Sequence, residues 1–209
     1  MTIRTLTRRA ALLAVTVTAS LALAACGGSD DGAAHAGHGG PASAAASATA
    51  AGPHNAQDVS FAQGMIPHHR QALEMAKLAD GRASSARVKD LAARIEKAQD
   101  PEIRTMTGWL TAWGEQVPMA GMDHSGHTGT TGMAGMMSDD DMAALKKATG
   151  ADFDSRFLSL MVEHHRGAVE MAGTEKSRGA YGPARTMAGD IVRAQNAEIQ
   201  EMERILGGS

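Results

Sequence analysis

The feature that most constrains the fold of this 209-residue chain is an internal repeat. When the sequence is shifted by 96 residues, positions 58–110 align with positions 154–206 without a gap, and 19 of the 53 aligned pairs are identical. A repeat of this length predicts one supersecondary unit that occurs twice and packs against its own copy. The chain therefore has two similar faces to bury against each other.

Each copy of the repeat has the periodicity of two helices. In the first half of the first copy, apolar residues and histidines recur every three or four residues, which predicts one helical face. This face consists of Phe61, Met65, His68, His69, Ala72, Met75 and Ala76. The second half carries a similar stripe from Leu91 to Leu110. We therefore expect an all-α fold: an antiparallel four-helix bundle built from two αα-hairpins with pseudo-twofold symmetry.

The composition of the remaining chain predicts its division into segments. We expect a signal peptide at 1–25, a tether at 26–56, the first hairpin at 57–114, a Met/His/Gly-rich linker at 115–138, and a short helix followed by the second hairpin at 139–209. Residues 57–209 would together form one domain. The tether is mostly Gly, Ala, Ser and Pro, which predicts disorder. Ser138, three residues before Asp141, is typical of a helix N-cap and predicts a short helix over 139–148.

The N-terminus predicts export. Three arginines precede an uncharged apolar run over 10–25, which is too short to span a membrane comfortably and is typical of a secretory signal. The run ends in Leu-Ala-Ala-Cys at 23–26, which resembles the lipobox of bacterial lipoproteins. This resemblance implies cleavage before Cys26, lipid attachment to its thiol, and a protein anchored to the outside of the cytoplasmic membrane or elsewhere in the cell envelope. The alternative is an ordinary secretory signal in which the Cys falls by chance.

Several classes of function are excluded or disfavoured by composition and motif. A single Cys excludes an intramolecular disulfide and any Cys-rich metal site. The net charge of −3 offers no basic excess for nucleic acid, so we expect no nucleic-acid partner. The chain has no His-Glu-x-x-His, phosphate loop or Gly-x-Ser-x-Gly motif. It also lacks the Glu-x-x-His pairs of ferritin-like di-iron sites, which weighs against an enzyme without deciding the question.

Polar residues interrupt the apolar stripes of both copies. Glu102 and Glu198 lie between Ile and Met with no Lys or Arg on the same stripe, so a buried carboxylate there would need a partner or a proton. The two His-His pairs on the facing helices are the available partners. Neighbouring histidines are 100° apart on a helix, so only one of each pair can point at the axis.

His, Met and Glu side chains that face one another predict a transition-metal site, and thioether with imidazole favours copper, Cu(I) above Cu(II). Other transition metals stay open. The candidate ligands are His68, His69, His164, His165, Met65, Met75, Met161, Met171, Met106, Met202, Glu102 and Glu198. Two alternatives are that the methionines only fill the core and that the His and Glu residues only hydrogen-bond.

The linker predicts a second place for metal. Its Gly/Thr-rich sequence has no core to fill, so packing does not explain its methionines, and capture of a soft metal does. The candidate ligands are Met119, Met122, His124, His127, Met133, Met136 and Met137. The alternative is a neutral flexible linker.

Three strings carry a family resemblance: FAQGMIPHHRQALEMA from Phe61, LAARIEKAQDPEIRTMTGWLTAWG from Leu91, and FLSLMVEHHRGAVEMA from Phe157. They resemble the DUF305 family over about residues 57–208. The resemblance implies a ferritin-like four-helix bundle and, for some members, copper binding or copper tolerance in the bacterial cell envelope.

These observations together predict an exported copper-binding lipoprotein that sequesters copper or passes it on. Its partners would be copper ions, the membrane through the lipid anchor, and another copper-handling protein of the envelope. One rival is a redox-active ferritin-like metalloenzyme that uses iron or copper. The other is a metal-free interaction module of the envelope.

Overall fold

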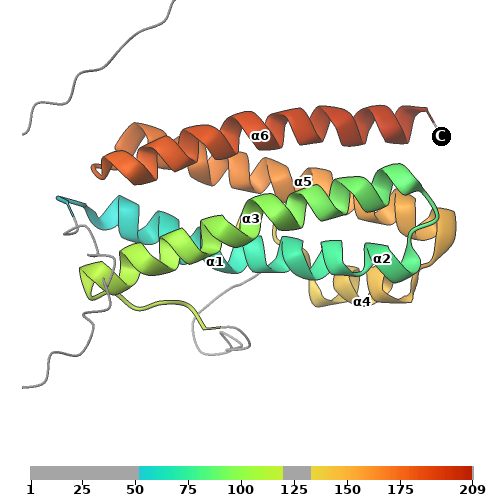
Figure 1. Ribbon diagram of the computed structural model, residues 1–209, viewed down its shortest axis with the longest axis horizontal. Coiled ribbons are helices and arrows are strands. Elements are labelled where there is room, and N and C mark those ends of the chain that lie inside the picture. Colours follow the sequence, from blue (N-terminus) through green and yellow to red (C-terminus); the bar gives the residue numbers. More distant parts are fainter. Residues whose placement is uncertain (1–51, 120–132, 209) are drawn as a thin grey trace, which may run out of the picture. The chain divides into compact units, whose positions relative to one another are not determined.

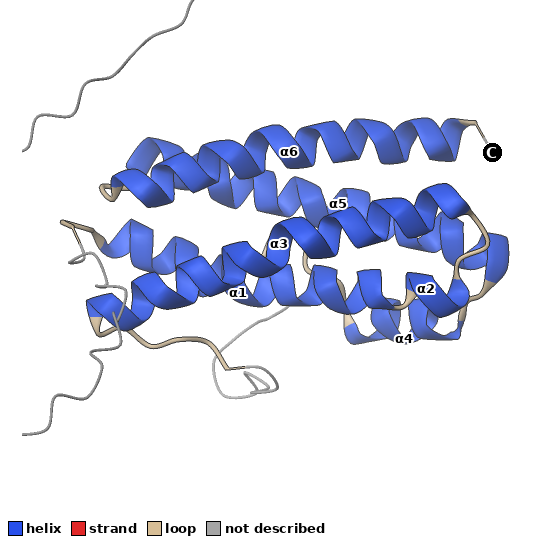
Figure 2. Ribbon diagram, viewed as in Figure 1, coloured by secondary structure: helices blue, strands red, loops and turns tan. Residues whose placement is uncertain are grey.

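The computed structural model describes residues 52–119 and 133–208. In these ranges it contains α1 (Ala56–Lys77), α2 (Ala79–Arg82), α3 (Ala86–Trp113), α4 (Asp139–Lys147), α5 (Gly150–Arg178) and α6 (Gly182–Gly207) (Figure 1). The other regular pairing in these ranges is an isolated bridge between Ala83 and Gly150. Helices and loops make up the described chain (Figure 2), so the domain is all-α, as the sequence predicted. Within the described ranges, no helix combines the length and apolarity that crossing a membrane requires.

The long helices form two hairpins. Helix α1 packs along α3, and the one-turn helix α2 lies between them in the chain. Helix α5 packs along α6 after a short turn, and α4 lies against α5. The hairpins meet chiefly where α1 contacts α5, and these two helices run in opposite directions (Figure 1).

Local sequence explains where several helices begin and end. Asn55 caps α1: its side chain accepts hydrogen bonds from the backbone of Gln57 and Asp58, and Asp58 accepts one in return from the Asn55 backbone. The predicted Ser138 cap is confirmed, because Ser138 and Asp141 form the same reciprocal box at the start of α4. Helix α3 ends at Gly114, whose φ of 73° is the left-handed conformation that favours glycine.

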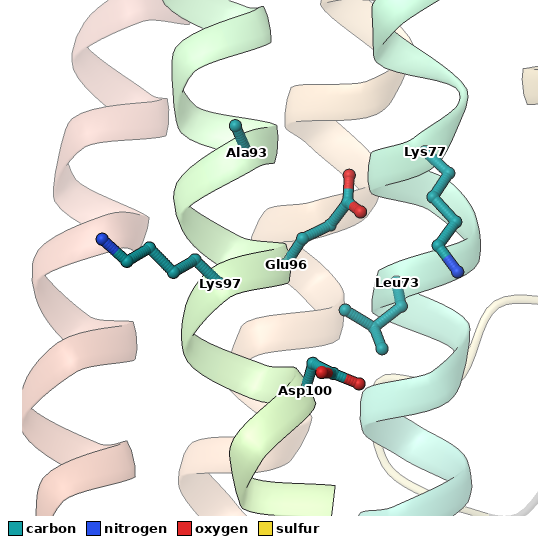
Figure 3. A pocket seen from close by; sticks show the side chains of 6 residues that line it. All are labelled: Leu73, Lys77, Ala93, Glu96, Lys97 and Asp100. Atoms are coloured by element: carbon teal, nitrogen blue, oxygen red, sulfur yellow. The ribbon is translucent and has the colours of Figure 1, made fainter.

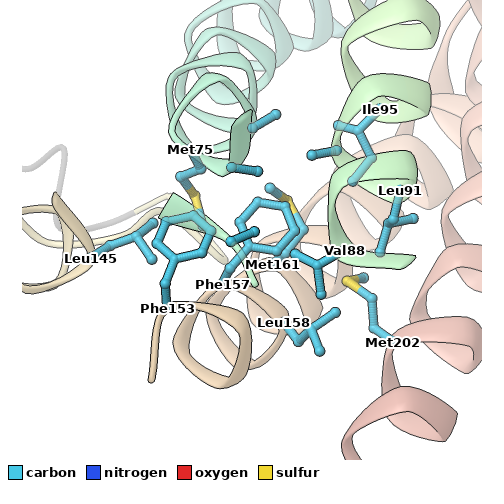
Figure 4. Close-up of a cluster of buried hydrophobic side chains, with 14 of the residues drawn as sticks. Met75, Val88, Leu91, Ile95, Leu145, Phe153, Phe157, Leu158, Met161 and Met202 are labelled. Atoms are coloured by element: carbon cyan, nitrogen blue, oxygen red, sulfur yellow. The ribbon is translucent and has the colours of Figure 1, made fainter. Parts of the chain in front are cut away.

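The core is built from methionine and aliphatic side chains with few rings. One cluster groups Met75, Met161 and Met202 with Phe153 and Phe157 (Figure 4). A second cluster contains Met65 and Met106. All five of these methionines are fully buried. Their flexible thioether chains fill the irregular space between Ala-rich helices.

Two aspartates fasten each hairpin to the turn of the other. Asp58, in the first turn of α1, accepts hydrogen bonds from the backbone of Ala180 and Tyr181, at 3.1 and 2.9 Å. Asp154, 96 positions later on α5, accepts them from the backbone of Ser84 and Ser85, at 3.2 and 2.9 Å. These reciprocal contacts hold α1 and α5 in a defined register along their axes.

Candidate metal centre

Two histidines from different hairpins meet in the interior. His68 of α1 and His164 of α5 are both fully buried, and their ring centroids lie 3.8 Å apart at an interplanar angle of 38°. None of their four ring nitrogens has a hydrogen-bond partner among the described residues. Buried polar atoms are rarely left without partners in native proteins, so this pair calls for an explanation.

The neighbouring histidines each have a partner at Nε2, whereas their Nδ1 atoms have none among the described residues. The Nε2 atom of His69 lies 2.7 Å from a carboxylate oxygen of Glu102, and that of His165 lies 2.8 Å from Glu198. Each contact joins the two helices of one hairpin. The prediction that one histidine of each pair faces inward is confirmed, and the structure identifies the inward residues as His68 and His164.

The expectation that both glutamates are buried is wrong in part. The side chains of Glu102 and Glu198 remain 25% and 16% exposed. They lie at the edge of the helix pair, where each carboxylate can keep water on one side while it contacts histidine on the other. They support His69 and His165 and lie outside the imidazole pair of His68 and His164.

Burial keeps the central imidazoles neutral. Burial, followed by the nearby His69 and His165, lowers the pKa of His68 to about 3; the Ala134 backbone, which lies near the ring but outside hydrogen-bond geometry, opposes this shift. Burial and the neighbouring histidines also lower the pKa of His164 well below its usual value. A neutral imidazole has one nitrogen with a free lone pair. The site therefore presents two metal-binding nitrogens that need not lose a proton at neutral pH.

Each helix also carries a buried thioether one turn from this pair. Met65 and Met161 precede His68 and His164 by three residues and so lie on the same helical face, one turn away. Both are fully buried. Among the described residues, no three His, Cys, Asp or Glu side chains are grouped closely enough to hold a metal ion. A donor set of imidazole and thioether fits a soft ion such as Cu(I).

The remaining candidate methionines differ in exposure. Met75, Met106 and Met202 are fully buried, whereas Met171 is partly exposed. In the linker, Met122, His124 and His127 lie outside the described residues, as does Cys26. Met119 is 61% exposed. Met133, Met136 and Met137 lie partly buried beyond the gap in the described chain.

Three buried polar residues are not among the predicted ligands, and nothing in the sequence indicated one of them, Glu175. Gln99 and Gln195, at equivalent positions of the repeat, are each 3% exposed, and their side-chain oxygens have no partner among the described residues. Their identity in both copies was an available indication. Glu175 is fully buried, and burial, together with the adjacent Asp58 carboxyl, raises its pKa to about 8. Its equivalent is Ala79, so the repeat gave no indication of it.

One surface groove lies away from these residues. It has a volume of about 520 Å³ and runs between α1 and α3 (Figure 3). Its lining residues are Leu73, Lys77, Ala93, Glu96, Lys97 and Asp100. None of them is a candidate ligand. The candidate metal centre is therefore in the interior of the domain.

The sequence of this helical domain matches the profile of a known protein family. The chain belongs to DUF305, a domain of unknown function, whose sequence profile matches residues 58–206. No curated protein matches this chain.

Solved structures of DUF305 proteins are similar to this one. A candidate secreted protein from Streptomyces coelicolor is 32% identical, with 73% of this chain and 91% of that chain covered and a TM-score of 0.65. A DUF305 fragment from Deinococcus radiodurans is 32% identical, with 76% and 100% covered and a TM-score of 0.65.

The chain is also similar to CopM, whose structure is known with copper bound. The Cu(I)-bound form is 32% identical, with 72% of this chain and 96% of that chain covered and a TM-score of 0.59. The Cu(II)-bound form is 35% identical over the same shares, with a TM-score of 0.62.

Proposed function

We propose that this protein binds copper in the cell envelope and either sequesters it or passes it on. The observation that carries the proposal is the buried pair His68 and His164, whose four ring nitrogens have no partner among the described residues. The pKa of His68 is lowered to about 3, so its ring is neutral at physiological pH and competes little with protons. Copper is the cargo in this proposal, held by these imidazoles together with buried thioethers.

The relatives support the choice of metal. CopM binds Cu(I), Cu(II) and silver in its solved structures. Copper and silver in the monovalent state are soft ions that favour thioether and imidazole ligands. Met65 and Met161 lie one turn before the histidines in their helices. Like Met75, Met106 and Met202, they are fully buried.

The wider organisation in this proposal follows from the sequence. The domain is a ferritin-like four-helix bundle in which two repeated hairpins each contribute one histidine to the centre. A lipid on Cys26 anchors the protein outside the cytoplasmic membrane, and residues 26–56 act as the tether. Met122, His124 and His127 capture ions in the linker, and another copper-handling protein of the envelope exchanges copper with the domain.

The test replaces the histidine pair with apolar residues. Because the ring nitrogens make no hydrogen bonds, His68→Leu/His164→Leu leaves no polar group without a partner, and we expect the protein to stay folded. The Cu(I) affinity, measured by competition with a chromophoric chelator, should fall by more than about 100-fold, since even outer-shell changes at metal sites cost about 10–100-fold. The control His54→Leu removes a histidine that stacks on Trp113 outside the centre.

The same experiment separates this proposal from a metal-free module. The contacts of His69 with Glu102 and of His165 with Glu198 would suit a purely structural role. A metal-free module predicts that the wild-type protein binds no copper. Unchanged copper binding in the double variant would instead place the metal away from His68 and His164.

A further inference from the structure

The end of the linker is built into the helical domain. Residues 133–137, called the crossing segment below, contact α1 and α5 close to the buried histidines. Gln71 of α1 holds the segment with two hydrogen bonds: its amide nitrogen donates to the Met137 carbonyl at 3.0 Å, and its amide oxygen accepts from the Met137 backbone at 2.8 Å.

The second copy of the repeat makes room for this segment. The position equivalent to Gln71 is Gly167, where a β-carbon would lie 1.9 Å from the carbonyl oxygen of Ala134. Gly135 has a φ of 79° and would place a β-carbon 2.7 Å from the carbonyl oxygen of Glu163. Glycine is therefore required at both positions, and the place where the two copies differ is explained by the path of the linker.

The crossing segment brings two thioethers together at the surface. The sulfur of Met133 lies 3.6 Å, and that of Met171 3.7 Å, from the point that a β-carbon on Gly64 would occupy. Both sulfurs therefore lie next to the same open position on α1. The arrangement occurs once in the described domain: Leu160 stands at the position equivalent to Gly64, and Met75, equivalent to Met171, is fully buried.

These sulfurs are accessible from two adjoining surface pockets. One, of about 380 Å³, is lined by Phe61, Gly64, Met133, Glu170 and Met171 among others. The other, of about 370 Å³, shares Gly64 and Met133 and adds the exposed Met119. Three methionines and one carboxylate therefore border a depression open to solvent. Thioethers bind soft monovalent ions, and methionine has enough rotatable bonds to close on one.

We propose that Met133 and Met171, whose sulfurs both lie next to Gly64, form an outer site for a soft monovalent cation of the Cu(I)/Ag(I) class. Met119 extends this site toward solvent, and the Glu170 carboxylate attracts the positive ion. Ala134 and Gly135, which follow Met133, lie against α5 at Gly167 and at the His164 carbonyl, so the outer site adjoins the segment that reaches the helix of the interior centre. The role of the outer site as an entry point rests on the proposed function, whereas ion binding at the outer site does not.

The test uses a substitution that fills the open position at Gly64 next to both sulfurs. In Gly64→Ala the new methyl group meets both sulfurs at ordinary contact distance, so it fits the ion-free protein but keeps the sulfurs from converging. Alanine also favours the helix over glycine, so the melting temperature should not fall. Loss of binding in this variant would not result from unfolding.

The measurement is a titration of the full chain, labelled with ¹³C at the methionine methyl groups, with Ag(I) alone. Met133→Leu and Met171→Leu assign the two signals, and Met187→Leu serves as the control. We expect both signals to shift together in the wild type, and the Ag(I) concentration needed to rise about tenfold or more in Gly64→Ala. Signals that do not shift in the wild type, or that shift equally in Gly64→Ala, would overturn the outer site.

The histidine ring signals separate this inference from the proposed function. Shifts at Met133 and Met171 without any change at His68 and His164 would keep the outer site and contradict the interior centre. With both present, Gly64→Ala should slow the appearance of Ag(I) at the histidines while leaving the final occupancy unchanged. Equal rates in the two proteins would contradict the role of the outer site in entry.

Discussion

At the scale of single residues, the function depends on which side chains remain without partners after folding. His69 and His165 each contact a glutamate, whereas the ring nitrogens of His68 and His164 have no hydrogen-bond partner in the described domain. A site that presents neutral nitrogens next to buried sulfur is prepared for a soft ion before the ion arrives. Within each His-His pair, one histidine is therefore the candidate ligand and the other has a structural role.

Substituting a core methionine tests whether its sulfur binds metal or only fills space. Met161→Leu keeps the volume of the side chain and should cost less than about 1.5 kcal/mol of folding stability. If the sulfur is a ligand, Cu(I) affinity should fall by about tenfold or more, as measured by chelator competition. The matched control is Met142→Leu, because Met142 is also buried in the core but lies on α4. Equal affinities of the two variants would assign Met161 to packing alone.

Glu175 predicts an unusual pH dependence of stability. Because burial and the adjacent Asp58 raise its pKa from 4.5 to about 8, the folded protein holds a proton there that the unfolded chain releases. Folding stability should therefore decrease as the pH rises from about 4.5 to about 8, by a few kcal/mol. Glu175→Gln should remove this decrease and stabilise the protein at pH 8, as measured by urea unfolding.

The control for that prediction is Glu170→Gln, which removes one exposed negative charge from the same helix. If the wild type and Glu175→Gln lost stability in parallel between pH 5 and pH 8, the assignment of a protonated Glu175 would be wrong.

At the scale of elements, the sequence predicts the positions of the helices but not the path of the linker. The helical stripe around His68 and the cap at Ser138 lie where the sequence predicts them. Helix α6 begins at Gly182, 96 residues after the start of α3 at Ala86, in agreement with the repeat. The crossing segment could not be predicted from composition, because Gly-rich sequence carries no periodic pattern. The difference between Gln71 and Gly167 was the one indication of it, since a departure within a repeat marks a contact that one copy makes alone.

Gly167 tests whether the crossing segment is fixed to the domain. In Gly167→Ala a methyl group would overlap the Ala134 carbonyl, so the segment must move, at a cost of about 1–3 kcal/mol. The Met137 backbone amide, now bonded to Gln71, should then exchange its hydrogen faster. Gly173→Ala is the matched control: it lies on the same helix with nothing within 4 Å and should stabilise the protein. Equal exchange at Met137 in both variants would contradict this account.

At the scale of the whole domain, the position of the candidate metal centre depends on how the hairpins are held together. His68 and His164 come from different hairpins, so their meeting requires α1 and α5 to be held in register. Asp58 and Asp154 supply that restraint from opposite ends, each through the turn of the other hairpin. Sequence alignment gave these two aspartates as an identical pair, but only the folded chain shows what they bind.

Removing one of these restraints should loosen the whole domain. Asp154→Ala removes a charged carboxylate that accepts hydrogen bonds from the Ser84 and Ser85 backbone N–H groups, and it should cost about 2–3 kcal/mol in urea unfolding. The control Asp152→Ala removes an exposed carboxylate that pairs with Arg156 on the same helix, which should cost about 0.5 kcal/mol. Similar costs for the two substitutions would mean that Asp154 does not fasten the hairpins.

The central claim is that the interior histidine pair holds the metal. The most direct test is anomalous diffraction from crystals of the protein loaded with one equivalent of Ag(I), measured on the wild type and on His68→Leu/His164→Leu. The account predicts an anomalous peak beside the His68 and His164 rings in the wild type and its loss in the double variant. A fully loaded wild-type crystal with no peak at these two histidines would contradict it.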